Sequence, residues 1–259
     1  MIKNIFGKVL FLFMSFAYII HNNPIYANNR AKIIPDLALI LARVDQQYRF
    51  KTGHAELEMQ IKTKNWQRTM RLEMWTKGLK KTLITIKTPK KDAGITTLRL
   101  AKSMWNYFPK INKVIKVPPS MMMGSWMGSD FTNDDLVKES TYLEDYSAKF
   151  SSGPAPDKYY IELRPKKNTV SVWDKVNLVV DKKTLILRQQ ENFDERGEKV
   201  RTMLFSDIKI MGGQLIPTTM SISSHKHQGN QTIVRYLSAT FNKEMLDSVF
   251  SRRNLQKKR

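Results

Sequence analysis

Alternating apolar and polar residues mark the first long runs of the chain. The strictest run begins at His54, and every second residue after it is apolar: Ala55, Leu57, Met59 and Ile61. A period of two is typical of a β-strand with one face in a core and one face in water. The next run repeats the pattern on even positions, with an interruption at Arg68: Trp66, Met70, Leu72 and Met74. The two runs therefore predict two strands, each with one buried face.

Further strands are expected along most of the chain. Gly78, Pro89 and Gly94 mark turns between them. The expected strands are 79–87, 95–101, 104–108, 111–117, 159–164, 176–180, 185–193, 200–211, 215–223 and 231–241, with one more ordered segment at 142–150. Residues 33–49 precede them and read as a helix, because Pro35 suits a first turn and apolar residues recur at intervals of three and four.

The number and spacing of these elements predict the fold class. No sequence repeat and no long linker divides the chain, so residues 28–259 are expected to form a single domain. At least ten antiparallel strands with two or more helices fit a mainly β (α+β) protein, in which one strongly curved sheet wraps around helices.

The middle of residues 104–139 breaks the regular pattern. Pro118, Pro119, Gly124 and Gly128 exclude a regular helix or strand, yet large apolar residues crowd between them: Met121, Met122, Met123, Trp126, Met127 and Phe131. One interpretation is a plug at the end of the sheet core. Another is a surface that repacks around a flexible apolar ligand, because Met fits several shapes at similar cost. A protein interface is the third.

A short helix is expected at the end of this stretch. Thr132 offers a capping hydroxyl, and the carboxylates of Asp134 and Asp135 follow it and complement the helix dipole. Leu136 is the apolar residue of this helix, which is expected to run to Glu139.

The first 27 residues have the layout of a secretory signal peptide. Lys3 and Lys8 precede a 12-residue apolar run at 9–20, and Ala27 is a small residue at the expected cut. Twelve residues span a bilayer poorly, so a retained anchor is the weaker alternative. No cysteine follows the run, so no lipid attachment is expected there. We therefore expect a periplasmic protein whose mature chain begins at Asn28.

The chain is strongly basic, with a formal net charge of +21 and no cysteine. Such a charge often indicates nucleic-acid binding, but export argues against it. Transient contact with an anionic membrane surface or an acidic partner is one alternative. Solvated lysines on strand faces are the other, since only the chain end forms a basic block: Arg252, Arg253, Lys257, Lys258 and Arg259.

Candidates for catalysis or metal binding are few. The chain has no Cys, no His-Glu-x-x-His, no Gly-x-Ser-x-Gly and no glycine loop for phosphate. The carboxylates at 130–139 could bind a cation, although helix capping already explains at least two of them. His225 and His227 could share a metal but lack a third ligand nearby. We expect neither an enzyme nor a metal or other cofactor.

The residues at 104–136 resemble the signature of the LolA-like outer-membrane lipoprotein-sorting family. The similar stretches are Met104-Trp105-Asn106-Tyr107, Pro109-Lys110-Ile111-Asn112, Pro118-Pro119-Ser120-Met121-Met122 and Ser125-Trp126-Met127-Gly128-Ser129-Asp130-Phe131-Thr132. Pieces at 179–182, 205–208 and 249–255 agree, so the resemblance covers most of the mature chain. It implies an unclosed half-barrel whose concave face is covered by helices and a loop.

The resemblance and the apolar composition together predict a carrier. It would shield acyl chains of a lipoprotein or lipid in a cavity lined by Leu57, Met59, Ile61, Met70, Leu72 and Met74, with Met121, Met122, Met123, Trp126, Met127 and Phe131 at the mouth. Thr132, Asp135 and Leu136 would belong to a lid helix. The carrier is expected to be a monomer that meets a membrane transporter. The alternative is a scaffolding subunit of such a transporter that docks through its Met-rich loop.

Overall fold

The computed structural model describes residues 36–137, 141–167, 169, 171–226 and 229–257. The expected leader, Pro35, Glu139 and His227 lie outside the described residues. The helices are α1 (Leu37–Gln46), α2 (Asn133–Val137), α3 (Tyr142–Asp145) and α4 (Arg252–Leu255), with 3-10 turns η1 (Pro109–Ile111), η2 (Pro119–Met121) and η3 (Asp247–Phe250).

The strands follow the expected series closely. They are β1 (Thr52–Lys62), β2 (Gln67–Lys77), β3 (Lys81–Thr88), β4 (Thr96–Leu100), β5 (Ser103–Phe108), β6 (Lys113–Lys116), β7 (Tyr146–Ser151), β8 (Lys158–Pro165), β9 (Lys175–Asp181), β10 (Leu187–Phe193), β11 (Lys199–Met211), β12 (Gln214–Ser224) and β13 (Gln231–Phe241). The expected strand at 111–117 is shorter, because η1 takes up Ile111 and Asn112 adopts a left-handed turn.

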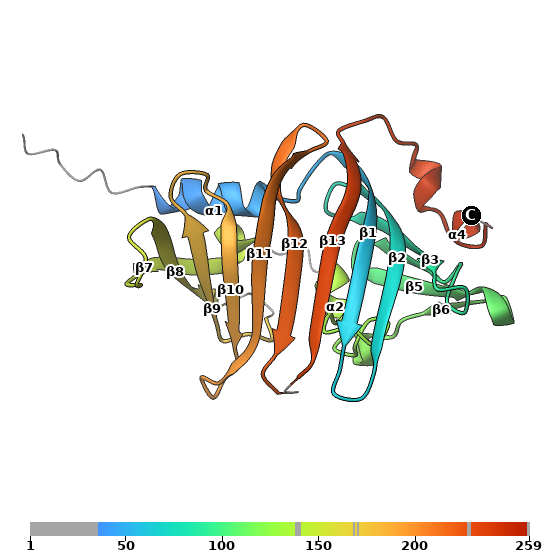
Figure 1. Ribbon diagram of the computed structural model, residues 1–259, viewed down its shortest axis with the longest axis horizontal. Helices are drawn as coiled ribbons and strands as arrows, with labels where there is room; N and C mark the ends of the chain where they lie inside the picture. Colours follow the sequence, from blue (N-terminus) through green and yellow to red (C-terminus); the bar gives the residue numbers. More distant parts are fainter. Residues whose placement is uncertain (1–35, 138–140, 168, 170, 227–228, 258–259) are drawn as a thin grey trace, which may run out of the picture. The chain divides into compact units, whose positions relative to one another are not determined.

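These 13 strands form one antiparallel sheet in the order β6-β5-β4-β3-β2-β1-β13-β12-β11-β10-β9-β8-β7 (Figure 1). Neighbours in the sheet are neighbours in the sequence, except β1 and β13. The edge strands β6 and β7 do not pair with each other, so the sheet is not closed. The expected unclosed antiparallel sheet is therefore confirmed. The chain runs outward from β1 to β6, connects to β7 at the opposite edge and returns to β13.

One face of the sheet, here called the inner face, carries a continuous apolar row. Met59 of β1 pairs with Met70 of β2 and with Val234 of β13. Val234 pairs in turn with Met220, and Met220 with Phe205. Directly paired residues point to the same side of a sheet, so the row crosses five strands. The predicted alternation is confirmed for these buried residues: Leu57, Met59, Ile61, Met70 and Leu72. It is wrong for Trp66, which precedes β2 and is 45% exposed.

Helix α1 covers a second part of the inner face. Asp36 caps the helix, because its side chain accepts hydrogen bonds from the backbone N–H groups of Ala38 (2.9 Å) and Leu39 (3.4 Å). The apolar side of α1 is buried against β8 to β11 through Ile40, Leu41 and Val44. The predicted helix is confirmed, although it is shorter than residues 33–49. Figure 1 shows α1 and α2 on the same side of the sheet, behind the strands.

The outer face carries a separate core formed by the end of the chain. Phe250 and Leu255 pack on Leu83 of β3 and Leu98 of β4. Asp247 accepts ion pairs from Lys77 and Lys81, at 2.8 and 3.0 Å. Sequence patterning did not indicate this packing, because the tail reads as a basic block and its apolar residues are few.

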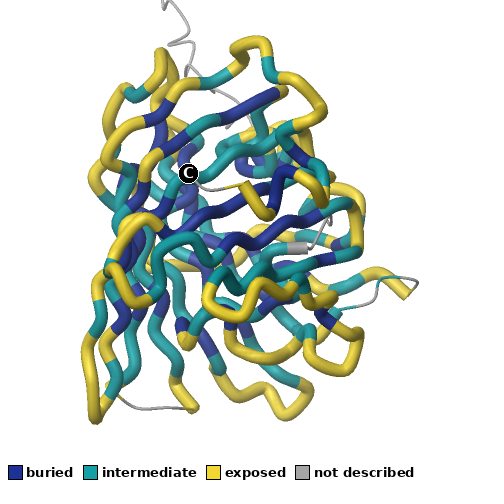
Figure 2. The backbone as a smooth tube through the Cα atoms, turned by 90° about the vertical axis from the view of Figure 1, so that its right-hand side faces the viewer, coloured by how far each residue is buried: buried dark blue, intermediate teal, exposed yellow. Residues whose placement is uncertain are grey.

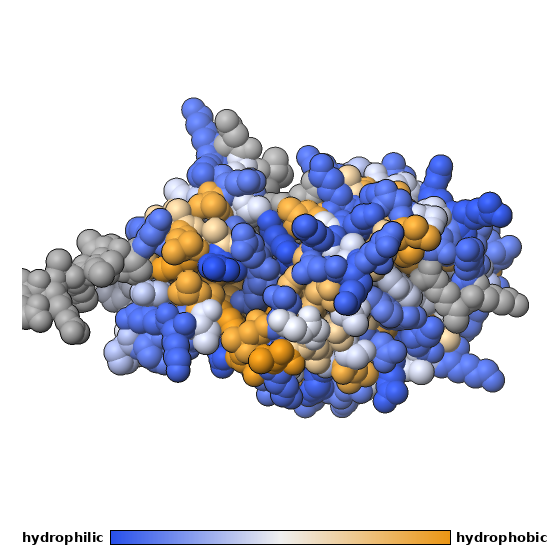
Figure 3. Space-filling model, turned by 90° about the horizontal axis from the view of Figure 1, so that it is seen from above, coloured by the Kyte–Doolittle hydropathy of each residue, from blue (hydrophilic) through white to orange (hydrophobic). Residues whose placement is uncertain are grey.

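Burial follows this architecture. Buried residues lie along the strands and exposed residues lie in the turns (Figure 2). Seen from above, the surface is largely hydrophilic, and its hydrophobic residues gather mainly at the left and lower middle of the view (Figure 3). Some exposed apolar side chains are neighbours, since Ile210 of β11 and Leu215 of β12 are directly paired.

We expect the C-terminal core to contribute strongly to stability. Phe250→Ala should lower the free energy of unfolding by about 3 to 5 kcal/mol, because a buried aromatic side chain is lost and a cavity remains. The matched control is Leu246→Ala, since Leu246 is 69% exposed and should change stability by less than about 0.5 kcal/mol. Urea unfolding measures both. Equal stability of the two variants would show that the tail is only loosely attached.

Candidate functional site

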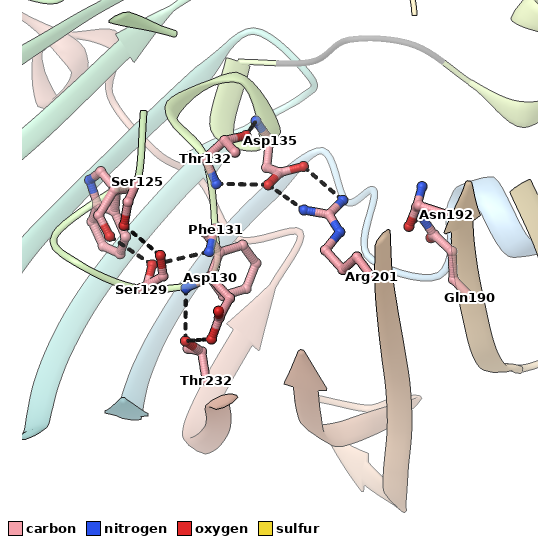
Figure 4. Close-up of polar contacts among 11 residues, drawn as sticks. Ser125, Ser129, Asp130, Phe131, Thr132, Asp135, Gln190, Asn192, Arg201 and Thr232 are labelled. Atoms are coloured by element: carbon pink, nitrogen blue, oxygen red, sulfur yellow. Dashed lines mark hydrogen bonds and ion pairs between the residues drawn. The ribbon is translucent and has the colours of Figure 1, made fainter. Parts of the chain in front are cut away.

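Residues 117–137, here called the central segment, pass from edge strand β6 onto the inner face and fold on themselves. The backbone N–H of Trp126 donates to the carbonyl of Phe131 at 2.7 Å, and the Ser129 hydroxyl donates to the carbonyl of Trp126 at 2.7 Å. Met127 and Gly128 have positive φ angles of 52° and 77°, and this conformation costs least at glycine. The predicted irregular backbone is confirmed, and its polar groups are paired internally (Figure 4).

Trp126 fixes the central segment to the sheet. Its side chain is 3% exposed, and its indole N–H donates to the Thr97 hydroxyl of β4 at 3.1 Å. It packs in the same buried cluster as Met104, Leu72 and Ile86. A buried indole needs both apolar contacts and a partner for its N–H, and this position supplies both.

The structure gathers most of the residues predicted for the cavity and its mouth into one cluster. Six are buried in it: Leu57, Met59, Ile61, Met70, Leu72 and Trp126. Five more, including the lid residue Leu136, are partly buried against it: Met74, Met122, Met127, Phe131 and Leu136. Met121 and Met123 differ, with exposures of 59% and 49%. The central segment thus covers β1 to β4 in the conformation described.

The start of helix α2 is a reciprocal cap. The Thr132 hydroxyl accepts the backbone N–H of Asp135 at 3.1 Å, and the Asp135 carboxylate accepts the backbone N–H of Thr132 at 2.8 Å. This exchange satisfies two helix donors at once. The predicted short helix is therefore confirmed over Asn133–Val137.

Asp135 also ties α2 to the other half of the sheet. Arg201 of β11 donates to both of its carboxylate oxygens, at 2.7 and 3.0 Å (Figure 4). The Trp173 ring lies over the Arg201 guanidinium at 5.1 Å. Burial alone would raise the pKa of Asp135, but the charge of Arg201 and the bonds from Arg201 and Thr132 outweigh it and hold the pKa below its usual value.

A second polar contact fixes the central segment to β13. The backbone N–H of Asp130 donates to the Thr232 hydroxyl at 2.9 Å, and that hydroxyl donates to the Asp130 carboxylate at 2.7 Å. Thr232 is fully buried. Asp130 and Asp135, two of the carboxylates considered for a cation, therefore have structural partners.

Where the central segment ends, the inner face contains a pocket of about 290 Å³. Its walls come from α1, α3, the end of the central segment and strands β9 to β12. Apolar and aromatic lining residues include Val44, Tyr48, Phe131, Tyr146, Trp173, Val176, Leu187, Met203, Phe205 and Met220. A neighbouring pocket of about 500 Å³ shares three lining residues with it: Phe131, Trp173 and Arg201. These three side chains therefore stand between two hollows.

Polar side chains form a row at the base of the 290 Å³ pocket. The Tyr142 hydroxyl donates to Gln190 at 2.5 Å, and the Gln190 amide donates to the Asn192 oxygen at 3.0 Å. Burial raises the pKa of Tyr142 above its usual value, so its hydroxyl stays protonated. Asp45 of α1 accepts the backbone N–H groups of Tyr142 and Leu143, and burial raises its pKa.

Sequence reasoning missed most of this pocket. Of the residues predicted for cavity, mouth and lid, it includes Phe131 and Asp135. A signal was nevertheless present, because Arg201 shares the alternating phase of Met203 and Phe205 and so had to point inward. Polar residues in the apolar phase of a strand indicate a buried polar site.

The other candidates for metal binding lie apart. His225 contacts the Thr202 hydroxyl at 2.9 Å on an exposed part of the sheet. Within 36–137, 141–167, 169, 171–226 and 229–257, no group of three or more His, Cys, Asp or Glu side chains is placed to hold a metal ion. In the same residues, no helix is long and apolar enough to cross a membrane.

Solved structures with this fold come from several bacteria. A DUF1329 family protein from Desulfovibrio piger is 21% identical, with a TM-score of 0.76 over 85% of this chain and 97% of that chain. A lipoprotein-sorting protein domain from Vibrio parahaemolyticus is 20% identical, with a TM-score of 0.73 over 85% and 98%. A LolA superfamily protein from Nitrosomonas europaea is 17% identical, with a TM-score of 0.68 over 83% and 97%.

Sequence comparisons add the family. A search of curated proteins finds no match. Residues 78–257 match the model of a family described as uncharacterized proteins. The chain belongs to this family, and its fold is the one found in LolA superfamily and outer-membrane lipoprotein-sorting structures, as the resemblance of its sequence predicted.

Proposed function

We propose that this protein is a periplasmic carrier that shields the acyl chains of a lipoprotein or another lipid for transfer between membranes. Residues 1–27 would direct export, and the mature chain would begin at Asn28. The proposal involves no covalent chemistry and no cofactor. The observation that carries it is the 290 Å³ pocket on the inner face, lined mainly by apolar and aromatic side chains in a lipoprotein-sorting fold.

The pocket has the character expected of a lipid site. Ligand pockets are concave and largely apolar, with a few polar groups that fix orientation. Its volume is at the lower end for such pockets, so a long acyl chain needs more room than the described conformation gives. The neighbouring 500 Å³ hollow, behind Phe131 and Trp173, would supply that room if Phe131 moved aside.

The central segment would therefore act as a lid. In the described conformation it covers the residues predicted to line the cavity, and two polar contacts hold its end: Arg201 to Asp135 and Thr232 to Asp130. The sheet would be a half-barrel with α1 and the central segment over its concave face. Lifting the segment would open the inner row from Met59 to Phe205 as one apolar trough. Met122, Met127 and their neighbours would then contact ligand.

Retention and release would both follow from burial. Each buried methylene contributes about 0.8 kcal/mol, so a chain of a dozen carbon atoms is held firmly. Release would need a partner that stabilises the open segment. We take this partner to be a membrane transporter. Met121 and Met123 are exposed on the central segment and would contact it. A scaffolding subunit would use the same two residues but need no exchangeable ligand.

Filling the pocket should abolish acyl binding. Met203→Trp places a large side chain in the pocket and should weaken binding of a fluorescent acyl probe at least about tenfold. Leu204→Trp is the matched control, because Leu204 is the next residue of β11 and is 45% exposed on the other face. Fluorescence titration gives both affinities, and thermal unfolding checks the fold. Equal affinities would place the ligand elsewhere, and no probe binding by the unmodified protein would favour the scaffold.

Fixing the central segment should stop exchange. The chain contains no cysteine, so Asp130→Cys with Thr232→Cys introduces the only thiols, at side chains already in contact. The oxidised protein should neither load nor release the probe, and reduction should restore both. Each single variant, treated with the same oxidant, is the control. Unchanged exchange in the cross-linked protein would mean that this segment is a fixed cap.

The lid contact should depend on pH. Because the pKa of Asp135 lies below 3.8 in the folded protein, its ion pair stabilises fully above about pH 4 and less as pH falls through the folded-state value. Asp135→Asn should therefore lower the free energy of unfolding at pH 7 by about 3 to 5 kcal/mol, since it leaves Arg201 buried without its counter-charge.

That difference should shrink as pH falls below about 4, because Asp135 of the unfolded chain takes up a proton there while the folded carboxyl is still ionised. Denaturant unfolding at pH 7, 4.5 and 3 measures it. Asp247→Asn, in an exposed ion pair, serves as the control and should have little effect. A constant difference across this range would show that Asp135 is not the titrating group.

A further inference from the structure

Most buried donors without partners belong to residues that line the 290 Å³ pocket. Among the described residues, four buried side-chain polar atoms make no hydrogen bond, and all four are N–H donors. Three of them belong to residues that line this pocket: Gln47, Asn192 and Arg201. Buried polar groups in native proteins are almost always paired, so such a concentration calls for an acceptor that arrives from outside the chain.

Two of these donors lie side by side. Asn192 of β10 and Arg201 of β11 are directly paired in the sheet, and their exposures are 0% and 7%. Paired side chains on one face stand about 5 Å apart at their Cβ atoms. Figure 4 shows the two side chains on neighbouring strands. A single small acceptor group could therefore reach both.

The neighbouring contacts determine which atoms are free. The Asn192 oxygen accepts from Gln190, so its Nδ2 carries the unused donors. Arg201 uses its two terminal nitrogens on Asp135, which leaves Nε. The Gln47 oxygen accepts the backbone N–H of Leu187 at 2.9 Å, and its Nε2 lies near the Tyr48 hydroxyl without a hydrogen bond of normal geometry. Each residue thus offers an N–H and no acceptor.

The charges around the pocket cancel. Arg201 is paired with Asp135, and Arg49 lies 3.8 Å from Asp45. A bound carboxylate or phosphate would bring a charge with no unpaired cation to meet it, and burying such a charge is costly. A neutral carbonyl oxygen accepts two hydrogen bonds and brings no charge. The donor set therefore suits an uncharged acceptor.

We propose that Asn192 Nδ2 and Arg201 Nε bind the carbonyl oxygen of an acyl ester or amide, while the acyl chain lies along the apolar walls. This inference rests on the proposed carrier function and names its ligand class: chains joined to a head group by a neutral carbonyl. Lipids and lipoproteins carry such carbonyls as esters or amides. The donors would set the depth at which the chain enters.

Displacement of a fluorescent acyl probe tests the proposal. The competitors share one chain length: methyl palmitate, N-methyl palmitamide, the matched alkane and palmitate. The ester or the amide should compete about tenfold better than the alkane, and whichever competes better identifies the linkage. Palmitate should compete no better than the methyl ester. Stronger binding of palmitate would overturn the choice of a neutral carbonyl.

The variants assign the effect to the donors. Asn192→Leu should bring the ester and alkane affinities together and leave alkane binding in place. Asn192→Asp keeps the acceptor for Gln190 and exchanges the Nδ2 donor for a carboxylate oxygen, which repels a carbonyl oxygen and can also occupy Arg201 Nε. It should therefore have the same effect if the Leu variant folds poorly. Asn177→Leu is the matched control, since Asn177 lies in the opposite phase of neighbouring strand β9 and should preserve the tenfold ratio.

The outcomes separate this inference from the carrier function. Equal competition by ester, amide and alkane in the unmodified protein would leave the carrier standing and show that water alone satisfies these donors. A tenfold ratio that survives both Asn192 variants would also overturn the proposal. Failure of every competitor and of the probe to bind would overturn the carrier function and this inference with it.

Discussion

The pairing of β1 with β13 is the contact on which the rest of the arrangement depends. Every other neighbouring pair in the sheet follows directly in the sequence, so hairpins can form locally. This one pairing joins two meanders, β1 to β6 and β7 to β13, at the centre of the sheet. Their outer strands, β6 and β7, therefore lie at opposite edges. The connection between those edges has to cross one face of the sheet. The place of the central segment is therefore set by topology, and its large apolar residues suit a segment that crosses a core.

The apolar residues in the two halves of the inner face are covered in different ways. Over β1 to β4 the central segment supplies Trp126 and its neighbours, and the apolar side chains pack against one another. Over β8 to β12 helix α1 covers only part of the face, and a hollow remains where inward polar residues meet. Arg201 links the halves, because it stands in the wall of the hollow and holds Asp135 of the segment. A shift of Arg201 in the wall of the hollow would therefore act directly on Asp135 in the cover of the other half.

Local pattern predicted much of the fold and little of the pocket. The alternation at Leu57, Met59 and Ile61, the helix around Ile40 and the cap at Thr132 depend on nearby residues, and each was predicted. The strand order was out of reach of pattern alone, since nothing in β1 specifies β13. Phe250 and Leu255 were missed because an apolar pair in a basic tail has no period. Asn192 and Arg201 were not predicted as site residues, because they form a site only when β10 and β11 pair and place them side by side. The sequence does show that Arg201 has the inward phase of β11.

The pairing of β1 with β13 also affects how the chain folds as it is made. Met59 pairs with Val234, about 175 residues later. At 5 to 20 residues per second, β1 emerges roughly 9 to 35 s before its partner. During that interval the first meander has an unpaired edge at β1, and exposed strand edges are templates for aggregation. Glu56 and Glu58, on the outward side of β1, would then act as charged gatekeepers that keep nascent chains from joining edge to edge.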